Sequence, residues 1–400
     1  MKILMLTPYL PYPPASGGQI RTLNLLKYLS KNNEIVLICL YKNEKEKKYA
    51  SYLETFCKKI YLCKRPEKPW QPTIILRAIF SPLPFLIVRN YSDDARKTVE
   101  KLLKNERFDV IHAETFYIMP HIHATAVPIL LVEQTIEYKV YQHFTNSFPF
   151  FIRPFFYLDI LKLRSWERHY WKKASLVATV SEADTRIISA IEPSIRSVVI
   201  PNGAGDEMFI KKINNKKIST PKILFMGNFF WLQNIEAAKY LIHHIFPHLL
   251  RLIPDIQVVI AGQEARRKLA LPLDPHIEII DIDPDDTPMV KKIYHDSTLF
   301  IAPIFGPGGT RLKILAAMAA GIPVVATKVG IEGLGVINGE HVVIANSPAE
   351  FANAVKTILS DHSFYNTLRR KAHALVRQKF SWMAIARQLE VVYKNITKKR

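Results

Sequence analysis

Short apolar runs alternate with segments of helical periodicity along nearly the whole chain. In the first half, six runs have the length and composition of buried strands, at residues 2–6, 34–40, 110–112, 129–132, 176–180 and 198–200. Segments with a helical repeat separate them, for example 19–29 and 92–104. Strands that alternate with helices in this way predict a parallel sheet with helical crossovers.

The same alternation restarts after Asn202. Strands are predicted at 222–226, 257–261, 277–280, 299–302, 323–326 and 341–344. The helices predicted between them cover 234–252, 310–320 and 348–360. The polar and basic segment 211–221 has the composition of a linker. The pattern therefore predicts an α/β protein with two doubly wound domains.

The composition is that of a globular protein with a cationic surface. Hydrophobic residues make up 48% of the 400 residues, charged residues 22%, and the formal net charge is +20. This charge is spread along the chain rather than gathered in one block, which argues against nucleic acid as a partner. Phosphorylated substrates and an anionic membrane surface remain as partners that suit such a surface.

The sequence predicts a cytoplasmic protein without a membrane span. Its three cysteines have neither zinc nor redox spacing, and a sparse, odd number fits a reducing compartment. The longest stretch without charge, 115–132, is interrupted by Pro120 and Pro128, so no transmembrane helix is expected. Any membrane contact would be peripheral.

Glycine is concentrated in residues 306–339, which hold eight of the 14 glycines. The turn after a predicted strand and the first helical turn that follows contain Gly308, Gly309, Thr310, Arg311 and Lys313. Bare backbone, a helix N-terminus and two cations together form an anion site, so we predict diphosphate binding here. The alternative is a capped helix with ordinary surface cations.

Two other turns follow predicted strands at the edge where parallel sheets bind ligands. The first holds Gly17 and Gly18, with Arg21 one turn into the next helix, and the second holds Gly227 and Asn228, with Asn234 in the next helix. Either turn could approach a ligand, and plain turns are the alternative. No glycine occurs from residue 19 to residue 202. Phosphate binding by backbone amides is therefore predicted mainly in the second domain.

Polar side chains also follow two inner strands of the first domain. His112 ends one strand, and Gln134 and Glu137 follow the next. A histidine at this edge suits a catalytic role, although a structural histidine is as common. A carboxylate there could act as a base or accept a hydrogen bond from a hydroxyl. The acidic segment 281–286 lies in a polar loop, where solvated acids are usual. The histidine pairs His121/His123 and His243/His244 lack further ligands, so no metal site is predicted.

The segment 146–173 is rich in aromatic residues with arginine and lysine between them. This composition is typical of a helix that lies on an anionic bilayer. The alternative is an ordinary packed helix whose aromatic side chains face the core and whose cations face water.

Taken in order, the motifs resemble the retaining GT-B glycosyltransferases of the large family 4 group. The resemblance runs from end to end and rests on Pro14-x-Ser16-Gly17-Gly18-x-x-Arg21, Asp109-Val110-Ile111-His112, Val180-Ser181-Glu182-x-Asp184, Ile200-Pro201-Asn202-Gly203, Phe225-x-Gly227, Ala261-Gly262, Gly309-Thr310-Arg311-Leu312-Lys313-Ile314-Leu315 and Ala317-Met318-Ala319-x-Gly321-x-Pro323-Val324-Val325. Each motif is modest alone, but their order and spacing together are specific.

The resemblance implies a GT-B fold, in which two Rossmann-like domains face each other across a cleft. Residues 1–205 would form the acceptor-side domain, 206–378 the nucleotide-sugar domain, and 379–400 a helix that crosses back to the first. The donor would be bound by Gly17, Gly18, Gly227, Asn228, Asn234, Gly308, Gly309, Thr310, Arg311 and Lys313. The acceptor side would hold Arg21, Gln134 and Glu137, and the catalytic residues would be His112, Arg311 and Lys313. The family needs no metal or other cofactor beyond its donor substrate.

The chain departs from the family pattern at three places. Gly308 and Ala316 stand where many relatives carry glutamates, and Gln134 stands where a histidine is frequent. The family usually carries an Arg/Lys pair after the first strand of the second domain, and this pair is absent near residues 228–234. Arg311 and Lys313 would supply the missing positive charge.

From these features we predict a transferase of the cell envelope, cytoplasmic or peripheral at the inner membrane face. It would move a hexose from a nucleoside-diphosphate sugar to a lipid-linked or cell-surface polysaccharide acceptor. The alternative, motivated by Ala316 and Gln134, is a catalytically impaired nucleotide-sugar-binding or assembly partner with the same fold.

Overall fold

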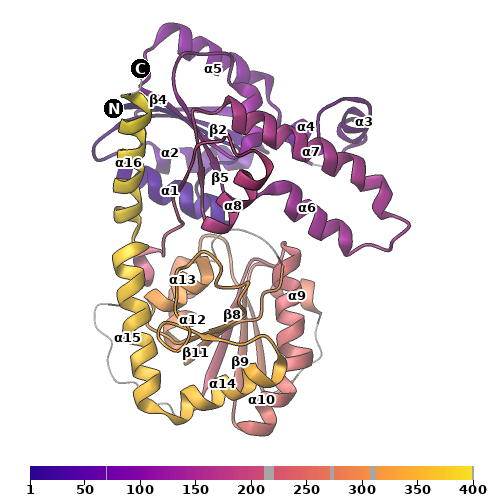
Figure 1. Ribbon diagram of the computed structural model, residues 1–400, viewed down its shortest axis with the longest axis vertical. Helices are drawn as coiled ribbons and strands as arrows, with labels where there is room; N and C mark the ends of the chain where they lie inside the picture. Colours follow the sequence, from indigo (N-terminus) through magenta and orange to yellow (C-terminus); the bar gives the residue numbers. More distant parts are fainter. Residues whose placement is uncertain (69, 211–219, 271–273, 307–311, 399–400) are drawn as a thin grey trace. The chain divides into compact units, whose positions relative to one another are not determined.

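A computed structural model describes residues 1–400 except 69, 211–219, 271–273, 307–311 and 399–400 (Figure 1). The chain forms two compact units. Unit 1 comprises Met1–Pro201 and Ile385–Arg400, and unit 2 comprises Asn202–Ala384. The predicted linker at 211–221 falls almost entirely outside the described residues.

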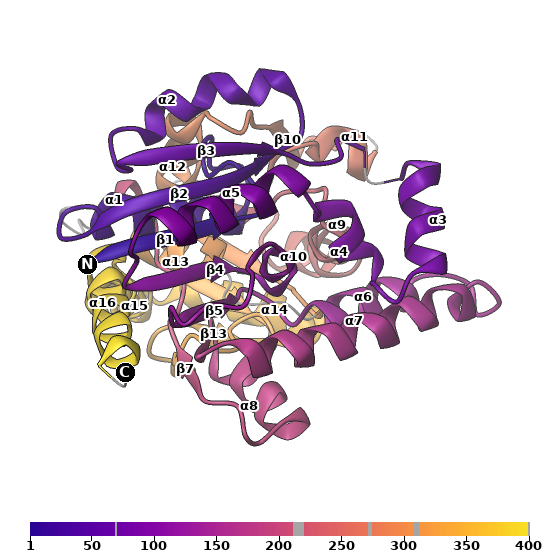
Figure 2. The same ribbon diagram turned by 90° about the horizontal axis from the view of Figure 1, so that it is seen from above.

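Unit 1 is built on a seven-stranded parallel sheet. Its strands are β1 (Lys2–Thr7), β2 (Glu34–Tyr41), β3 (Lys59–Lys64), β4 (Val110–Glu114), β5 (Ile129–Glu133), β6 (Leu176–Thr179) and β7 (Ser197–Val199). They are hydrogen-bonded in the order β3-β2-β1-β4-β5-β6-β7, and Figure 2 shows β3, β2, β1, β4 and β5 side by side in this sequence. The inner strands are buried almost throughout, which explains their nearly continuous apolar runs.

Helices flank this sheet. They are α1 (Gly17–Leu29), α2 (Ala50–Leu53), α3 (Pro72–Phe80), α4 (Phe85–Asn90), α5 (Asp93–Asn105), α6 (Glu137–Asn146), α7 (Arg153–Lys173), α8 (Glu182–Ile191) and α16 (Trp382–Thr397), with short 3₁₀ turns η1 (Glu44–Tyr49) and η2 (Phe116–His121). The side chains of Ser16, Ser92 and Ser181 cap the first turns of α1, α5 and α8 by accepting backbone N–H groups.

Unit 2 is built on a six-stranded parallel sheet. Its strands are β8 (Lys222–Met226), β9 (Gln257–Gly262), β10 (Ile277–Asp281), β11 (Leu299–Ala302), β12 (Val324–Ala326) and β13 (Val343–Ile344), in the order β10-β9-β8-β11-β12-β13. Its helices are α9 (Leu232–Tyr240), α10 (Phe246–Leu252), α11 (Ala265–Leu269), α12 (Thr287–Asp296), α13 (Leu312–Ala319), α14 (Pro348–Ser360) and α15 (His362–Lys379), with shorter turns η3 (Asp206–Met208) and η4 (Leu241–Ile245). The predicted α/β class with two doubly wound sheets is confirmed.

The strand orders fix where a ligand can bind in each unit. The order reverses between β1 and β4 in unit 1 and between β8 and β11 in unit 2. At such a switch point the connections leave the carboxyl ends of adjacent strands in opposite directions and open a crevice there. The candidate residues of each unit are therefore expected at these strand ends.

The last helix, α16, packs on unit 1 through one apolar face. Leu389 and Tyr393 are fully buried. The Gln388 amide donates to the Val199 carbonyl at 3.1 Å, and the Asn33 amide donates to the Glu390 carboxylate at 2.9 Å. Among the residues that the structure describes, no helix has both the length and the apolar character that crossing a bilayer requires.

Candidate functional site

In unit 2, four of the predicted donor residues come together at the carboxyl end of β8. The Lys313 ammonium, in the first turn of α13, donates to the Asn234 side-chain oxygen in the first turn of α9. The Asn234 amide in turn donates to the Asn228 carbonyl at 2.6 Å. The Asn228 amide donates to the Gln263 side chain, just after β9, at 3.0 Å. One hydrogen-bonded chain thus links the ends of two strands to the starts of two helices.

Two glycines are required for this arrangement. A Cβ atom at Gly227 would lie 2.9 Å from Cγ of Asn234 and 3.1 Å from Nζ of Lys313. Gly262 has φ of +147°, and a Cβ there would lie 1.8 Å from the Gly227 carbonyl oxygen. The backbones after β8 and β9 therefore approach more closely than any side chain allows.

Lys313 places a positive charge in the first turn of α13. Its Nζ atom lies 5.1 Å from the centroid of the Phe225 ring, and the Tyr294 hydroxyl donates to its carbonyl at 3.1 Å. These contacts hold a half-buried positive charge at a helix N-terminus, which favours an anion. The predicted donor residues Gly308, Gly309, Thr310 and Arg311 lie outside the described residues.

In unit 1, a buried polar network lies at the switch point between β1 and β4. His112 contacts the Glu114 carboxylate at 2.9 Å through Nε2 and the Tyr393 hydroxyl of α16 through Nδ1. The Gln134 amide donates to Glu114 at 2.6 Å and to the Tyr9 hydroxyl at 2.9 Å. Burial would raise the pKa of Glu114, but the hydrogen bond and charge of His112 hold it below its ordinary value. His112 is fully buried, with both ring nitrogens engaged.

Arg21 is also fully buried in this network. Its Nη1 atom donates to the carbonyls of Ile200 and Pro201 at 3.1 and 3.0 Å, and its Nε lies 3.8 Å from the Glu114 carboxylate. Burial lowers the pKa of Arg21, and the Glu114 charge opposes this shift. The Arg21 guanidinium thus connects α1 to the backbone at Ile200 and Pro201, where the first segment of unit 1 ends.

The turn at Gly17 and Gly18 lies against the same network. A Cβ at Gly18 would lie 2.5 Å from the Tyr9 hydroxyl oxygen and 2.6 Å from the Gln134 side-chain oxygen. Gly17 is exposed and begins α1, one residue after its serine cap. Gly18 and Gln134 are therefore in close proximity.

Three carboxyl groups cluster at the start of α6. Burial raises the pKa of Glu137 to about 7, while the Thr135 hydroxyl donates to its carboxylate at 3.2 Å. Glu167 of α7 is fully buried and accepts the backbone N–H groups of Glu137 and Tyr138 at 2.7 and 3.1 Å. Glu133 accepts the Trp171 indole N–H at 2.7 Å. Burial raises the pKa of both Glu133 and Glu167 well above the ordinary value.

Sequence reasoning missed several members of these clusters. Glu114 could have been found, because it lies two residues after His112 and therefore on the same face of β4. Gln263 follows the quoted Ala261-Gly262 motif directly. Glu167 and Tyr393 carried no signal, since each lies in a helix far along the chain from its partners. No cluster of potential metal ligands occurs among the described residues.

Comparisons with known proteins agree with the two units. A family model described as "Glycosyltransferase Family 4" matches residues 15–207, and one described as "Glycosyl transferases group 1" matches residues 220–361. A protein of Klebsiella pneumoniae, described as an uncharacterized 44.6 kDa protein in cps region, is 25% identical over 95% of this chain and 96% of its own length.

Solved structures show the same architecture. Anabaena HepE in complex with UDP-glucose has a TM-score of 0.66 at 17% identity, covering 99% of this chain and 100% of HepE. WaaG, a glycosyltransferase involved in lipopolysaccharide biosynthesis, has a TM-score of 0.66 at 13% identity, covering 98% of this chain and 99% of WaaG. At these identities the likeness demonstrates the fold.

Two parallel Rossmann-like sheets, each with its polar residues at the switch point, define a glycosyltransferase scaffold of the GT-B type. The two family matches together cover most of the chain. The chain belongs to the GT-B glycosyltransferases, with a family 4 domain followed by a group 1 domain.

Proposed function

We propose that the chain transfers a hexose, with retention of configuration, from a nucleoside-diphosphate sugar to a lipid-linked or surface-polysaccharide acceptor. The observation that carries the proposal is the cluster of Gly227, Asn228, Asn234 and Lys313 at the switch point of unit 2. It combines closely approaching backbone, a helix N-terminus and a positioned cation, which suits a diphosphate. The complex of HepE with UDP-glucose supports the donor class.

In the proposed reaction, the acceptor hydroxyl oxygen forms a bond to the anomeric carbon while the bond from that carbon to the diphosphate oxygen breaks. The hydroxyl proton passes to the departing phosphate on the same face of the sugar. The products are the glycoside and the nucleoside diphosphate. Negative charge grows on the diphosphate, so Lys313 and Arg311 contribute by stabilising it, and no metal is needed for this role.

On the acceptor side, we propose distinct roles for the predicted residues. Glu137 has a pKa of about 7, so it can accept a hydrogen bond or a proton from an acceptor hydroxyl near neutral pH. Gln134 and Gly18 would line the same edge. His112 and Arg21 are fully buried, so we assign them positioning roles: His112 orients Glu114, and Arg21 holds the chain at Ile200 and Pro201.

The acceptor class rests on the relatives. WaaG is described as involved in lipopolysaccharide biosynthesis, and the Klebsiella relative is described by its place in a cps region. We accordingly propose a role in building cell-envelope polysaccharide, at the cytoplasmic face of the membrane.

The test uses the purified chain with a panel of nucleoside-diphosphate sugars. A thermal-shift screen identifies the donor, because a ligand that binds only the folded state raises the melting temperature. Donor hydrolysis and transfer are then measured for wild type and Arg311→Ala. Loss of turnover in Arg311→Ala supports the proposal, whereas an unchanged rate would remove Arg311 from the catalytic set.

Ala316 favours a second candidate function, that of a nucleotide-sugar-binding or assembly partner. Ala316 lies on α13, half-buried against the core of unit 2, at a position where the resemblance to family 4 implies a glutamate. An alanine offers no acceptor for donor hydroxyls, which suits a nucleotide-sugar-binding or assembly partner with little activity. Calorimetry that detects donor binding, together with no turnover on any acceptor, would select this function.

A further inference from the structure

Helix α3 exposes apolar side chains on the face that points away from unit 1. Its inner face packs Ile74 and Ala78 against Phe85 and Val88. Its outer face carries Leu76, Ile79 and Phe80, and Phe80 is 83% exposed. A surface helix in water normally carries polar residues on this face. Helix α3 therefore has apolar residues on both faces, as in a helix that is buried on both sides.

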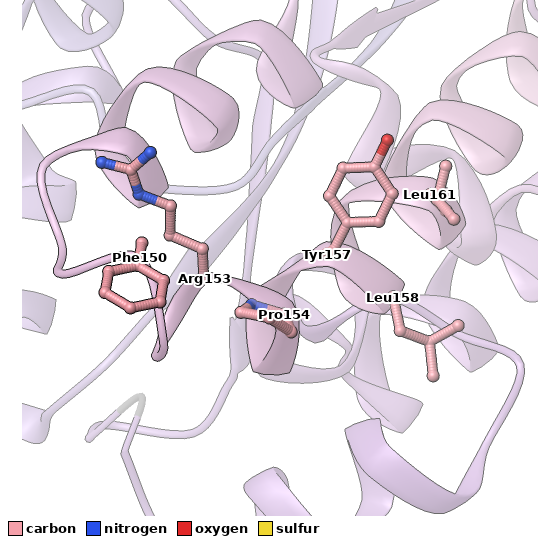
Figure 3. A pocket seen from close by; sticks show the side chains of 6 residues that line it. All are labelled: Phe150, Arg153, Pro154, Tyr157, Leu158 and Leu161. Atoms are coloured by element: carbon pink, nitrogen blue, oxygen red, sulfur yellow. The ribbon is translucent and has the colours of Figure 1, made fainter.

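A second exposed apolar group lies where the helical hairpin of α6 and α7 turns. Phe150 and Phe155 are 80% and 83% exposed, and Phe151 lies between them in the turn region. Phe150 lines a mostly apolar pocket together with residues of α7, and Figure 3 shows its lining side chains, which include Tyr157, Leu158 and Leu161. Among the described residues, 11 of the 19 exposed large apolar side chains lie between residues 70 and 161. Such a concentration marks an interaction surface.

Hydrogen bonds join the end of α3 to α7, the helix that follows the turn. The Lys162 ammonium of α7 donates to the carbonyls of Ala78 and Ser81 at 2.8 and 2.7 Å, at the end of α3. The Trp166 indole donates to the Pro82 carbonyl at 2.9 Å. Figures 1 and 2 both place α3 beside the hairpin. We call the residues Leu76, Ile79, Phe80, Phe150, Phe151 and Phe155 the aromatic face.

The charges around the aromatic face indicate what covers it. Residues 139–173 hold seven Lys and Arg and two acidic residues, and two of the seven cations, Arg168 and Lys172, pair with the Glu192 carboxylate at 2.6 and 2.8 Å. One of these acids, Asp159, accepts the Phe85 backbone N–H at 2.8 Å, and the other, Glu167, is fully buried. A second copy of the chain would bring two cationic surfaces together, which is repulsive. An anionic lipid surface offers both an apolar phase and opposite charge.

We propose that the aromatic face inserts into the interface of an anionic phospholipid bilayer, with α3 and the hairpin turn as the docking elements. Helix α6 begins at Glu137, just after the carboxyl end of β5, and runs about 15 Å to the turn. Docking would hold the acceptor edge of unit 1 near the membrane, where the head group of a lipid-linked acceptor lies. This last step rests on the proposed function; the docking itself does not.

The test measures sedimentation of the full chain with vesicles of phosphatidylcholine, with or without phosphatidylglycerol, and needs no donor or acceptor. Wild type should bind the phosphatidylglycerol vesicles, less so as salt is raised. The variant Phe150→Ser/Phe151→Ser/Phe155→Ser should bind at least roughly tenfold more weakly. The matched control, Ile337→Ser/Val391→Ser, removes exposed apolar side chains elsewhere and should bind as wild type.

A second readout follows Trp70, which is exposed and stacks on Phe85 beside α3. In a Trp166→Phe/Trp231→Phe background, in which the two other tryptophans, Trp171 and Trp382, are buried, its emission should shift to the blue and be quenched by brominated lipid. Wild-type binding by the triple serine variant, or no binding of wild type to any vesicle, would overturn the proposal. Equal binding to both vesicle types would refute the anionic requirement. A concentration-dependent dimer that the triple variant abolishes, without vesicle binding, would assign the face to a second copy instead.

Discussion

Glu137→Gln should change how the stability of the chain depends on pH. The pKa of Glu137 is about 7 in the folded chain against 4.5 for an ordinary glutamate, because the carboxyl group is buried. A raised pKa means that the folded state binds the proton more tightly than the unfolded state. The contribution of this protonated carboxyl group to the free energy of unfolding is complete below pH about 4.5 and is lost as pH rises through about 7.

The magnitude follows from the separation of the two pKa values. Each unit of difference between the folded and unfolded pKa values of Glu137 corresponds to about 1.4 kcal/mol. With allowance for the partial exposure of Glu137, wild type should lose roughly 2 to 3 kcal/mol of unfolding free energy from this group as pH rises through this range. The glutamine has no proton to lose. It also removes a negative charge that raises the pKa of Glu133 and Glu167, so the effect on these neighbours has the same sign.

The assay is urea unfolding, followed by tryptophan fluorescence, between about pH 5 and about pH 8. Relative to wild type, Glu137→Gln should become more stable as pH rises, by the amount given above. The control is Glu54→Gln, an exposed glutamate after α2, whose profile should run parallel to that of wild type. Parallel profiles for Glu137→Gln and wild type would refute the reasoning that burial raises this pKa.

Three further substitutions test the site. Lys313→Met should lower kcat by roughly 10²-fold or more, since it removes a cation from the leaving diphosphate, while Lys356→Met on the exposed side of α14 should leave kcat unchanged. Gly227→Ala should raise the donor KM about tenfold or more, because its Cβ displaces the partners of Lys313; titration calorimetry with unaltered donor affinity would contradict this. Tyr393→Phe should cost about 1 to 3 kcal/mol of stability by leaving a His112 nitrogen unpaired, with KM unaffected; a large change in KM would argue that this pair contacts substrate.

The secondary structure around the sites was predictable because it depends on local pattern. Buried parallel strands need apolar runs on both faces, and the chain supplies them at nearly every inner strand. The edge strand β3 was not predicted, because lysines end it on both sides and most of its residues are only half-buried. The helix predicted within residues 379–400 is observed as α16, and its apolar residues recur at helical spacing.

The site of unit 2 was predictable in part for a topological reason. Gly227, Asn228 and Asn234 follow one strand and Lys313 follows another, and in a doubly wound sheet such strand ends meet at one edge. The sequence could not indicate that Lys313 donates to Asn234, or that Gly262 presses against the Gly227 carbonyl. These contacts depend on how two helices are set against the sheet.

By itself, the sequence determined the alternation of strands and helices, the glycine turns and the cationic character of the surface, because these follow from residues close in the chain. Only the tertiary structure decided which charges are buried. Arg21 and His112 were predicted at a ligand edge, and folding encloses both with Glu114 and Tyr393. It also left the aromatic residues of the α6–α7 turn exposed, where the composition allowed either a packed or a membrane-facing helix. Burial depends on what the rest of the chain brings to a residue, and no local pattern contains that information.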